Sequence, residues 1–199
     1  INGRSLDDIN QMNLNIKQKM KIIFELLLIV EYIHFNNYIY RDLKPDNIII
    51  TDNNIYLFDF NRMIKNDYKL DKENIVTVDF MQQFIAPEHS EQEYTSKSDI
   101  YSLGLIIKFI LSNEIYHFSK LNEICNQCIS QDPSKRPNID QIIDLFFNEY
   151  YSKMIKFPSN LKLPPNLNIH NEFFFPYWFY IAEFENQNAC VRLLSLANV

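Results

Sequence analysis

The chain has 199 residues, of which 47% are apolar and 15% aromatic, and only two of them are glycine. This apolar content is far above that of disordered chains, and a chain of this length buries roughly 70% of its unfolded surface on folding. Neither glycine belongs to a G-x-G-x-x-G or G-x-x-x-x-G-K-S/T sequence. The composition therefore predicts a globular domain and excludes functions that need such a phosphate loop within these residues.

Nineteen basic residues stand against 25 acidic ones, which gives a net charge of −6. The basic residues form no long run, so we expect no nucleic-acid partner. The most apolar stretch, residues 22–30, contains Glu25 and is too short to cross a bilayer, so we expect no membrane span.

Three cysteines are too few, and odd in number, for a disulfide framework. This favours a reducing compartment, and we expect a cytoplasmic location. Cys125 and Cys128 form a CxxC pair, but no second ligand pair follows at zinc spacing. Packing in the core is therefore favoured over a metal site.

Residues 15–35 contain neither proline nor glycine and are apolar almost all round after Lys21, which predicts a central helix packed on several sides. Two short β-branched runs, 48–50 and 55–58, flank the turn sequence TDNN. They predict a small hairpin laid on that helix. Residues 61–78 are polar and show no period, so we expect an irregular segment.

Loop signals then alternate with helical apolar periods in FIAPEH, SKSDIYSLGLIIKFIL and DPSKRPNIDQIIDLF. Ser98 and Asp132 stand where helix N-caps are expected. We assign residues 1–150 to one domain. The proline-bearing residues 151–172 predict a linker or wrapped tail, and residues 173–199 predict an aromatic and helical appendage, which packs on the domain or begins a helical repeat.

Two loops carry the residues that suggest chemistry. YRDLKPDN at 40–47 lies between the long helix and the hairpin, and DFN at 59–61 directly follows the second strand. Phosphoryl transfer to a hydroxyl needs a carboxylate that receives the proton, oxygen ligands for Mg²⁺, and cations for the phosphate. The two loops together contain all three.

Asp42 is the candidate base, and Lys44 can reach a γ-phosphate as a point charge. Asn47 and Asp59 offer an amide oxygen and a carboxylate, which are hard ligands suited to Mg²⁺. The alternative is that these Asp and Asn residues only cap loops. The four in this order favour a site.

From its first residues to about Phe147, the chain resembles the C-terminal lobe of a eukaryotic protein kinase. In that family the catalytic loop reads H-R-D-L-K-P-x-N, the metal loop D-F-G, and the end of the activation segment A-P-E. Here they read YRDLKPDN, DFN and, at 86–88, APE. The resemblance implies a mainly α fold, in which a helical bundle carries a small β-hairpin with the catalytic and metal loops. Lys44 in the RDLKPDN context resembles serine/threonine kinases.

The resemblance further implies a protein serine/threonine kinase, a transferase that binds ATP and Mg²⁺ and phosphorylates hydroxyl groups of a protein substrate. In that role Asp42 is the base and Lys44 contacts the γ-phosphate. Asn47 and Asp59 hold the metal, and Ile49 supplies the floor under the adenine.

Five further residues resemble structural positions of the family. Asp99, in DIYSLG, corresponds to the aspartate that holds the catalytic-loop backbone through buried hydrogen bonds. Arg136, in DPSKRP, corresponds to the arginine that pairs with the glutamate of A-P-E, here Glu88. Tyr40 replaces the usual histidine, and its ring can stack on Phe60.

Thr77 is the candidate activation phosphosite, with Arg41 able to pair with the phosphate. An ordinary loop threonine is the alternative. Besides Tyr40, three residues depart from the family pattern. Asn61 replaces the glycine of D-F-G, where asparagine is the residue that best tolerates positive φ. Phe80 and Met81 replace a Gly-Thr. These departures leave open a pseudokinase or kinase-like interaction module without turnover.

The opening INGRSLDDIN resembles the segment just after the kinase hinge. The resemblance implies that the N-terminal lobe, with its glycine-rich loop, its lysine and the glutamate that pairs with it, is missing from this chain. We therefore expect that the chain alone is inactive and that turnover requires the missing lobe.

Overall fold

The computed structural model describes residues 3–51, 54–66, 83–91 and 94–146, all of which belong to one compact unit spanning residues 1–146. The predicted linker (151–172) and appendage (173–199) lie outside the described residues. So do Thr77, Phe80 and Met81. The expectations for these segments and residues stay predictions.

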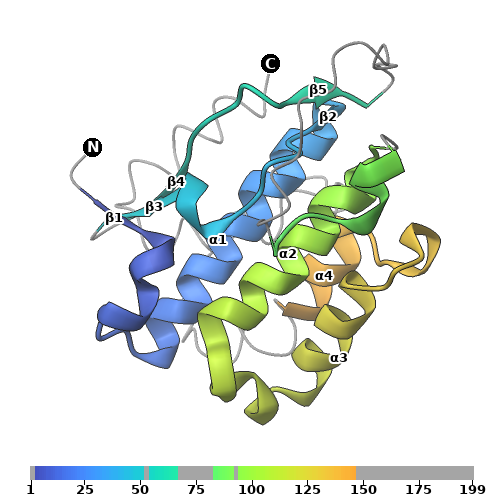
Figure 1. Cartoon of the computed structure of the whole chain (residues 1–199). Helices are drawn as coiled ribbons and strands as arrows, with labels where there is room; N and C mark the ends of the chain where they lie inside the picture. Colours follow the sequence, from blue (N-terminus) through green and yellow to red (C-terminus); the bar gives the residue numbers. More distant parts are fainter. Residues whose placement is uncertain (1–2, 52–53, 67–82, 92–93, 147–199) are drawn as a thin grey trace, which may run out of the picture. The chain divides into compact units, whose positions relative to one another are not determined.

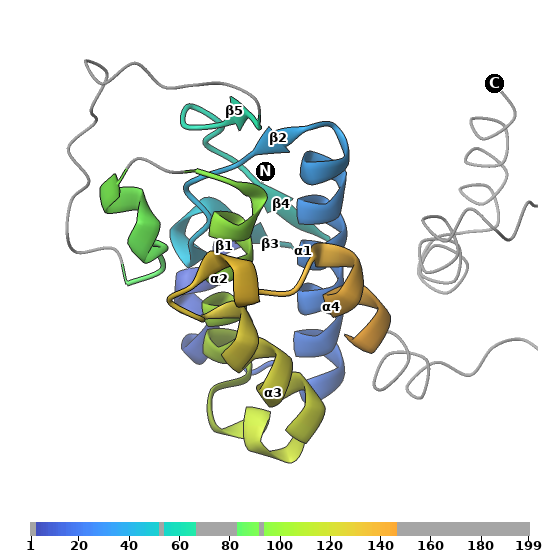
Figure 2. The same ribbon diagram turned by 90° about the vertical axis from the view of Figure 1, so that its right-hand side faces the viewer.

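Helices make up most of the described unit, as predicted. The α-helices are α1 (Ile16–Phe35), α2 (Ser96–Leu111), α3 (Ser119–Cys128) and α4 (Ile139–Phe146), and the short 3-10 turns are η1 (Leu6–Gln11), η2 (Pro45–Asn47), η3 (Pro87–Glu91), η4 (Ser112–His117) and η5 (Pro133–Lys135). Helix α1 packs on α2 and α4, while α3 packs on α2 (Figures 1 and 2).

Helix α1 is the predicted central helix. It begins after Asn15, whose side chain accepts from the Gln18 backbone N–H (3.0 Å), while the Gln18 side chain accepts from the Asn15 N–H (2.9 Å). This capping box satisfies two of the N–H groups that lack a partner within the helix. On α1, Phe24 stacks on Phe146 of α4 with ring centroids 6.1 Å apart, which joins the two helices in the core.

The strands form two small sheets. The predicted hairpin is β3 (Ile48–Ile50) paired with β4 (Ile55–Leu57), and β1 (Arg4–Ser5) adds a third antiparallel strand beside β3. The second sheet pairs β2 (Tyr38–Ile39) with β5 (Ile64–Lys65). The expectation of an irregular segment over 61–78 was therefore wrong at its start, because a two-residue strand shows no period of its own and exists only through its partner.

Two helix starts differ in how well they were predicted. The N-cap of α2 is Thr95, and Ser98 is the third helical residue of the same capping box, so the prediction of Ser98 as the cap was wrong. Both hydroxyls stabilise the start of the helix, because the Thr95 side chain accepts from the Ser98 backbone N–H and the Ser98 side chain accepts from the Thr95 backbone N–H. Asp132 caps η5 as expected, accepting from the Ser134 N–H at 2.9 Å.

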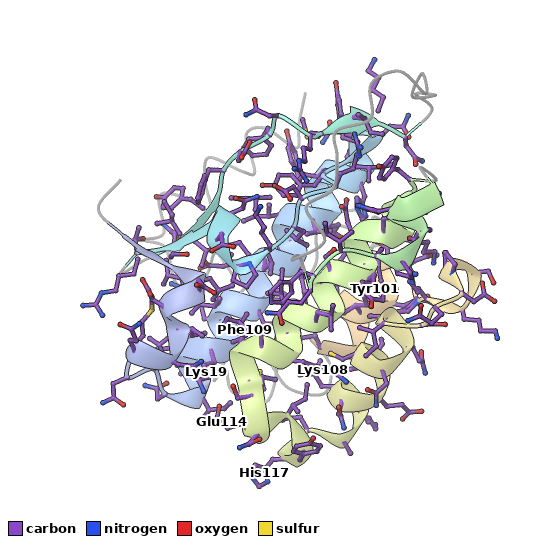
Figure 3. All side chains as sticks on the ribbon, viewed as in Figure 1. Lys19, Tyr101, Lys108, Phe109, Glu114 and His117 are labelled. Atoms are coloured by element: carbon purple, nitrogen blue, oxygen red, sulfur yellow. The ribbon has the colours of Figure 1, made fainter. Side chains whose placement is uncertain are left out.

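An ion pair connects the start of α1 to η4. Lys19, near the start of α1, pairs with Glu114 of η4 at 2.6 Å (Figure 3). Glu114 is about half exposed, so this pair adds little to stability. It nevertheless links the first turns of α1 to the segment that follows α2.

Helices α2 and α3 approach closely at Gly104. A Cβ atom added at Gly104 would lie 2.5 Å from the Cys128 Cβ and 3.2 Å from the Cys125 backbone oxygen. Cys125 and Cys128 are both fully buried, and burial raises the pKa of both thiols, to about 12 for Cys128. The CxxC pair therefore packs in the core, as predicted, against the glycine of α2.

A buried glutamate, Glu31, lies at the contact between α1 and α4. Glu31 of α1 is buried, and burial together with the charges of Asp140 and Asp144 on α4 raises the pKa of its carboxyl to about 7, from an ordinary 4.5. The folded protein therefore holds a proton on Glu31 that the unfolded chain has already released between these pH values.

Gly104→Ala should destabilise the protein by about 1–3 kcal/mol, because the new methyl group overpacks the α2–α3 contact. Helix propensity alone works in the opposite direction, since alanine is favoured over glycine by about 1 kcal/mol in a helix. The measurement is urea unfolding at neutral pH, with the larger Gly104→Ser as a second variant that should cost more. Equal or higher stability of the alanine variant would contradict the close approach.

Glu31→Gln should remove a pH-dependent penalty. Because the folded pKa lies above the unfolded one, stability falls as pH rises from about 4.5 to 7, by at most about 3 kcal/mol, and the loss stays complete above that range. The variant should therefore be more stable than the parent at pH 8 and nearly equal to it at pH 4.5. Unfolding curves at the two pH values test this, with the exposed Glu123→Gln as the control that changes neither.

Candidate active site

Asp99, in the first turn of α2, holds the catalytic loop in place. It is only 1% exposed, and its Oδ2 accepts from the Tyr40 backbone N–H while its Oδ1 accepts from the Arg41 N–H, both at 2.8 Å. The His34 Nε2 lies 2.8 Å from the same Oδ2. The backbone bonds are those expected of Asp99, whereas the contribution of His34 was missed, because nothing in its local sequence marks it.

The two site loops contain strained backbone. Arg41 has φ 72° and Asp59 has φ 62°, in the region that non-glycine residues rarely adopt, at a cost of about 1–3 kcal/mol each. Asn61, at the position of the family's glycine, does not have positive φ, and the chain turns at Asp59 instead. The Asn61 N–H donates to Asp59 Oδ1 at 3.4 Å across that turn. Asn61 therefore sits without the strain that the missing glycine suggested.

The structure brings Asp42, Lys44 and Asn47 into direct contact. The Asp42 carboxylate is buried, and its Oδ2 lies 3.2 Å from Lys44 Nζ. Asn47 Nδ2 donates to the same Oδ2 at 3.0 Å and to the Asp42 backbone oxygen at 2.9 Å. Pro45 and Asn47 bound the single turn η2, which folds the loop back so that these side chains converge.

The metal loop is tied to the catalytic loop through Phe58. The Phe58 N–H donates to the Asn47 backbone oxygen at 3.1 Å, and the Tyr40 hydroxyl donates to the Phe58 backbone oxygen. Burial raises the pKa of Tyr40, and the nearby charges of Asp42 and Asp59 raise it further. Asp59 itself is exposed.

The remaining predicted residues of the site are Ile49 and the Tyr40–Phe60 ring pair. Ile49 is on β3 and is half-buried, and its backbone pairs with Tyr56 of β4. The rings of Tyr40 and Phe60, which were predicted to stack, have centroids 5.6 Å apart and meet edge to face at 83°. This geometry is favourable for aromatic pairs.

Asn47 and Asp59, the predicted magnesium ligands, offer an amide oxygen and a carboxylate on two loops that the Phe58–Asn47 backbone hydrogen bond connects. Mg²⁺ usually takes one or two protein oxygens and completes its shell with water and phosphate oxygens. The described residues contain no cluster of three or more His, Cys, Asp and Glu side chains placed to hold a metal.

Arg62 is a site residue that sequence reasoning missed. Its Nη1 lies 3.4 Å from Asp42 Oδ1, on the other carboxylate oxygen from Lys44. Its backbone oxygen accepts from Arg41 Nη1 at 3.3 Å, and the Arg41 guanidinium lies over the Tyr94 ring at 3.8 Å. An arginine after the metal loop carries no motif signal, so only the fold reveals its contact with Asp42.

Glu88 and Arg136 form the predicted ion pair. It is bidentate, with Nη1 to Oε1 at 2.6 Å and Nη2 to Oε2 at 2.8 Å, and the arginine side chain is fully buried. Ser98 Oγ also donates to Glu88 Oε1 at 2.8 Å. Burial alone raises the pKa of Glu88, but the hydrogen bonds from Arg136 and Ser98 outweigh it and lower the pKa. The pair joins η3 to the start of α2 and to η5.

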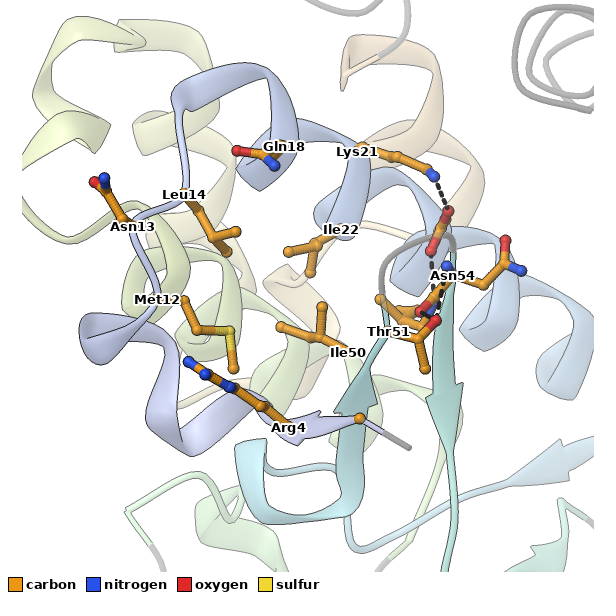
Figure 4. Close-up of a pocket in the computed structure, with 13 residues that line it drawn as sticks. Arg4, Met12, Asn13, Leu14, Gln18, Lys21, Ile22, Ile50, Thr51 and Asn54 are labelled. Atoms are coloured by element: carbon orange, nitrogen blue, oxygen red, sulfur yellow. Dashed lines mark hydrogen bonds and ion pairs between the residues drawn. The ribbon is translucent and has the colours of Figure 1, made fainter. Parts of the chain in front are cut away.

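A separate pocket of about 530 Å³ lies at the hairpin and the first half of α1 (Figure 4). Its walls include Leu14, Ile22 and Ile50, and at one end Lys21 pairs with Glu25, which accepts from the Ile55 N–H at 2.8 Å. None of the predicted site residues lines it.

Among the described helices, none combines the length and apolar character that a membrane span requires.

The chain was compared with models of known protein families. The family model of the protein kinase domain matches residues 1–119, which is more than half of the chain. The chain therefore belongs to the protein kinase family, and its described residues have the fold of a kinase C-terminal lobe. The Glu88–Arg136 pair extends the resemblance past residue 119, where the family match ends.

Three relatives illustrate the match. The R436 protein of Acanthamoeba polyphaga mimivirus, which its name assigns to the serine/threonine-protein kinases, is 31% identical over 131 residues, or 61% of this chain and 47% of that protein. Serine/threonine-protein kinase MPS1 of Encephalitozoon cuniculi is 29% identical over 151 residues, covering 60% and 25%. The STE20-related kinase adapter protein strd-1 of Caenorhabditis elegans is 39% identical over 100 residues, covering 47% and 26%. The chain thus spans about half of R436 and a quarter of the other two.

Breaking the Glu88–Arg136 pair should cost about 3–5 kcal/mol of stability, because the surviving charge is left buried without its partner. Glu88→Gln and Arg136→Met, measured singly and together by urea unfolding, form a double-mutant cycle. The double variant should lose less than the sum of the two single losses. Lys135→Ala, which breaks the exposed pair with Asp132, is the control and should cost less than about 1 kcal/mol. Additive losses would contradict the predicted coupling.

Proposed function

We propose that this chain is the C-terminal lobe of a protein serine/threonine kinase, which transfers the γ-phosphoryl group of ATP to hydroxyl groups of a protein substrate. The observation that carries the proposal is the buried Asp42 carboxylate in contact with Lys44 and Asn47, on a loop whose backbone Asp99 holds. A base, a cation and an oxygen donor in one fixed loop match the needs of phosphoryl transfer.

In the proposed reaction, the substrate hydroxyl oxygen forms a bond to the γ-phosphorus while the bond to the leaving ADP oxygen breaks. Asp42 receives the hydroxyl proton. Lys44, at 3.2 Å from Asp42, lies where its charge can act on the transferring phosphoryl group. Bound Mg²⁺ neutralises developing phosphate charge, and Asn47 and Asp59 are the residues that would hold it.

Most of the catalytic arrangement is set before a substrate arrives. Asn47 fixes the Asp42 carboxylate through its amide nitrogen, so the amide oxygen is the atom left to serve a metal. The Phe58 bond to the Asn47 backbone keeps the metal loop beside the catalytic loop. Such prior positioning lowers the entropic cost of bringing the reacting groups together.

ATP binding in this proposal needs parts that these residues do not contain. Ile49 offers an apolar surface for the adenine, but the sequence has no glycine-rich loop for the phosphates. We therefore propose that turnover requires an N-terminal lobe in addition to this chain. Phosphorylation is therefore tested with a protein in which an N-terminal kinase lobe precedes these residues.

A kinase-like scaffold without turnover is the second candidate function. Three observations favour it. Arg62 occupies one oxygen of the proposed base, and Asp59 is exposed and accepts a long 3.4 Å bond from the Asn61 N–H. A relative named as a kinase adapter protein is also 39% identical over 100 residues. In this reading, the fold is retained to present a binding surface.

Asp42→Asn should lower phosphorylation of a generic protein substrate by about 10²- to 10⁴-fold, because the amide cannot take the hydroxyl proton. The assay follows transfer of labelled phosphate from ATP with Mg²⁺ present. Asp46→Asn, an exposed aspartate in the same loop, is the matched control and should keep the activity of the parent.

The scaffold reading makes the opposite prediction. A full-length protein that shows neither phosphate transfer nor a thermal shift with Mg²⁺-ATP would overturn the kinase proposal. Equal activity of the parent and the Asp42→Asn variant would overturn the role assigned to Asp42.

A further inference from the structure

The two oxygens of the Asp42 carboxylate are held by different partners. Oδ2 lies 3.2 Å from Lys44 Nζ and accepts from Asn47 Nδ2 at 3.0 Å. Oδ1 lies 3.4 Å from Arg62 Nη1. Lys44 and Asn47 belong to the same loop as Asp42, whereas Arg62 belongs to the segment that leads from the metal loop to β5.

A substrate hydroxyl must come within hydrogen-bond distance of one of these oxygens for Asp42 to take its proton. Oδ2 already has two partners, both nearer than the one partner of Oδ1. The Arg62 contact is the longest of the three, and its side chain is 30% exposed against 19% for Lys44. Oδ1 is therefore the more accessible oxygen for an incoming hydroxyl, which must share it with the Arg62 guanidinium or displace that guanidinium.

The displaced guanidinium stays close to the acceptor, because the backbone of Arg62 is anchored. Its carbonyl oxygen accepts from Arg41 Nη1, and the Arg41 guanidinium lies over Tyr94. Within the described part of the chain, Asp42 is the one carboxylate at ion-pair distance from Arg62. Once displaced, the arginine is available to pair with a carboxylate of another molecule, which offers it two parallel hydrogen bonds.

We propose that Arg62 is a specificity-determining residue that selects substrates with an acidic side chain directly beside the hydroxyl to be phosphorylated. The substrate thereby supplies both the hydroxyl that displaces Arg62 from Asp42 and the carboxylate that replaces Asp42 as its partner. This inference rests on the proposed kinase function, from which it takes the acceptor position at Asp42.

The test compares three serine peptides that are identical except beside the serine: glutamate before it, glutamate after it, or glutamine at both places. Binding of each labelled peptide to the full-length protein without ATP is measured by fluorescence anisotropy, and phosphorylation by kcat/KM. The variants are Arg62→Gln, which removes the charge, and Arg62→Lys, which keeps it. Arg4→Gln is the matched control, because Arg4 lies on β1 and has no contact with Asp42.

At least one glutamate peptide should bind the parent about five- to tenfold more tightly than the glutamine peptide, which corresponds to about 1.4 kcal/mol at the upper end. In phosphorylation, the preferred glutamate peptide should have a lower KM than the glutamine peptide and a similar kcat. Arg62→Gln should reduce the preference to about one, Arg62→Lys should keep part of it, and Arg4→Gln should keep all of it. The preference should also weaken as salt is raised.

Three results would overturn the inference. One is equal binding of all three peptides by the parent, and another is a preference that survives in Arg62→Gln. The third is an Arg62→Gln effect on kcat of the same size for every peptide, since a uniform fall would place Arg62 on the phosphoryl group and a uniform rise would make it a block on the base. Absence of phosphorylation in every variant would instead count against the proposed kinase function, while the binding arm still decides the role of Arg62.

Discussion

The carboxylate of Asp99 is the interaction on which the site depends. It takes hydrogen bonds from two consecutive backbone N–H groups, at Tyr40 and Arg41, and lies beside the His34 ring. Its place in the first turn of α2 lets the positive end of the helix dipole stabilise its charge. These bonds hold Arg41 at positive φ, and that turn directs Tyr40 toward Phe58 and sets the start of the loop that carries Asp42.

Two arginine–carboxylate pairs in this lobe have different roles. Arg136 and Glu88 are bound through two short hydrogen bonds with the arginine fully buried, so the pair is fixed and its loss is expensive. Arg62 and Asp42 make a single longer contact, and Arg62 is partly exposed. The first pair therefore holds segments together, while the second can open when another partner arrives, which is the property that the proposed substrate selection requires.

The helical core explains why α2 can act as a fixed support for Asp99. Gly104 lets α3 approach α2 until the Cys128 Cβ leaves no room for a further carbon, and α1 packs against both α2 and α4. In a closely packed core, a shift of one helix forces its neighbours to shift as well. The N-terminal turn of α2 therefore cannot move independently of the bundle. The position of the catalytic loop thus follows from packing far from the loop itself.

The sequence by itself determined the central helix, the hairpin, and the family, because helical periods, turn chemistry and the strings YRDLKPDN, DFN and APE are all local signals. It also identified Asp99 and the Glu88–Arg136 pair, through resemblance at fixed motif positions. Only the tertiary structure decided that His34 and Arg62 touch the site, that β5 exists, that the strained turn is at Asp59 rather than Asn61, and that Thr95 caps α2. The physical reason is common to most of these: contacts between residues far apart in the chain, and backbone angles set by such contacts, leave no periodic or motif signature in the segment that makes them.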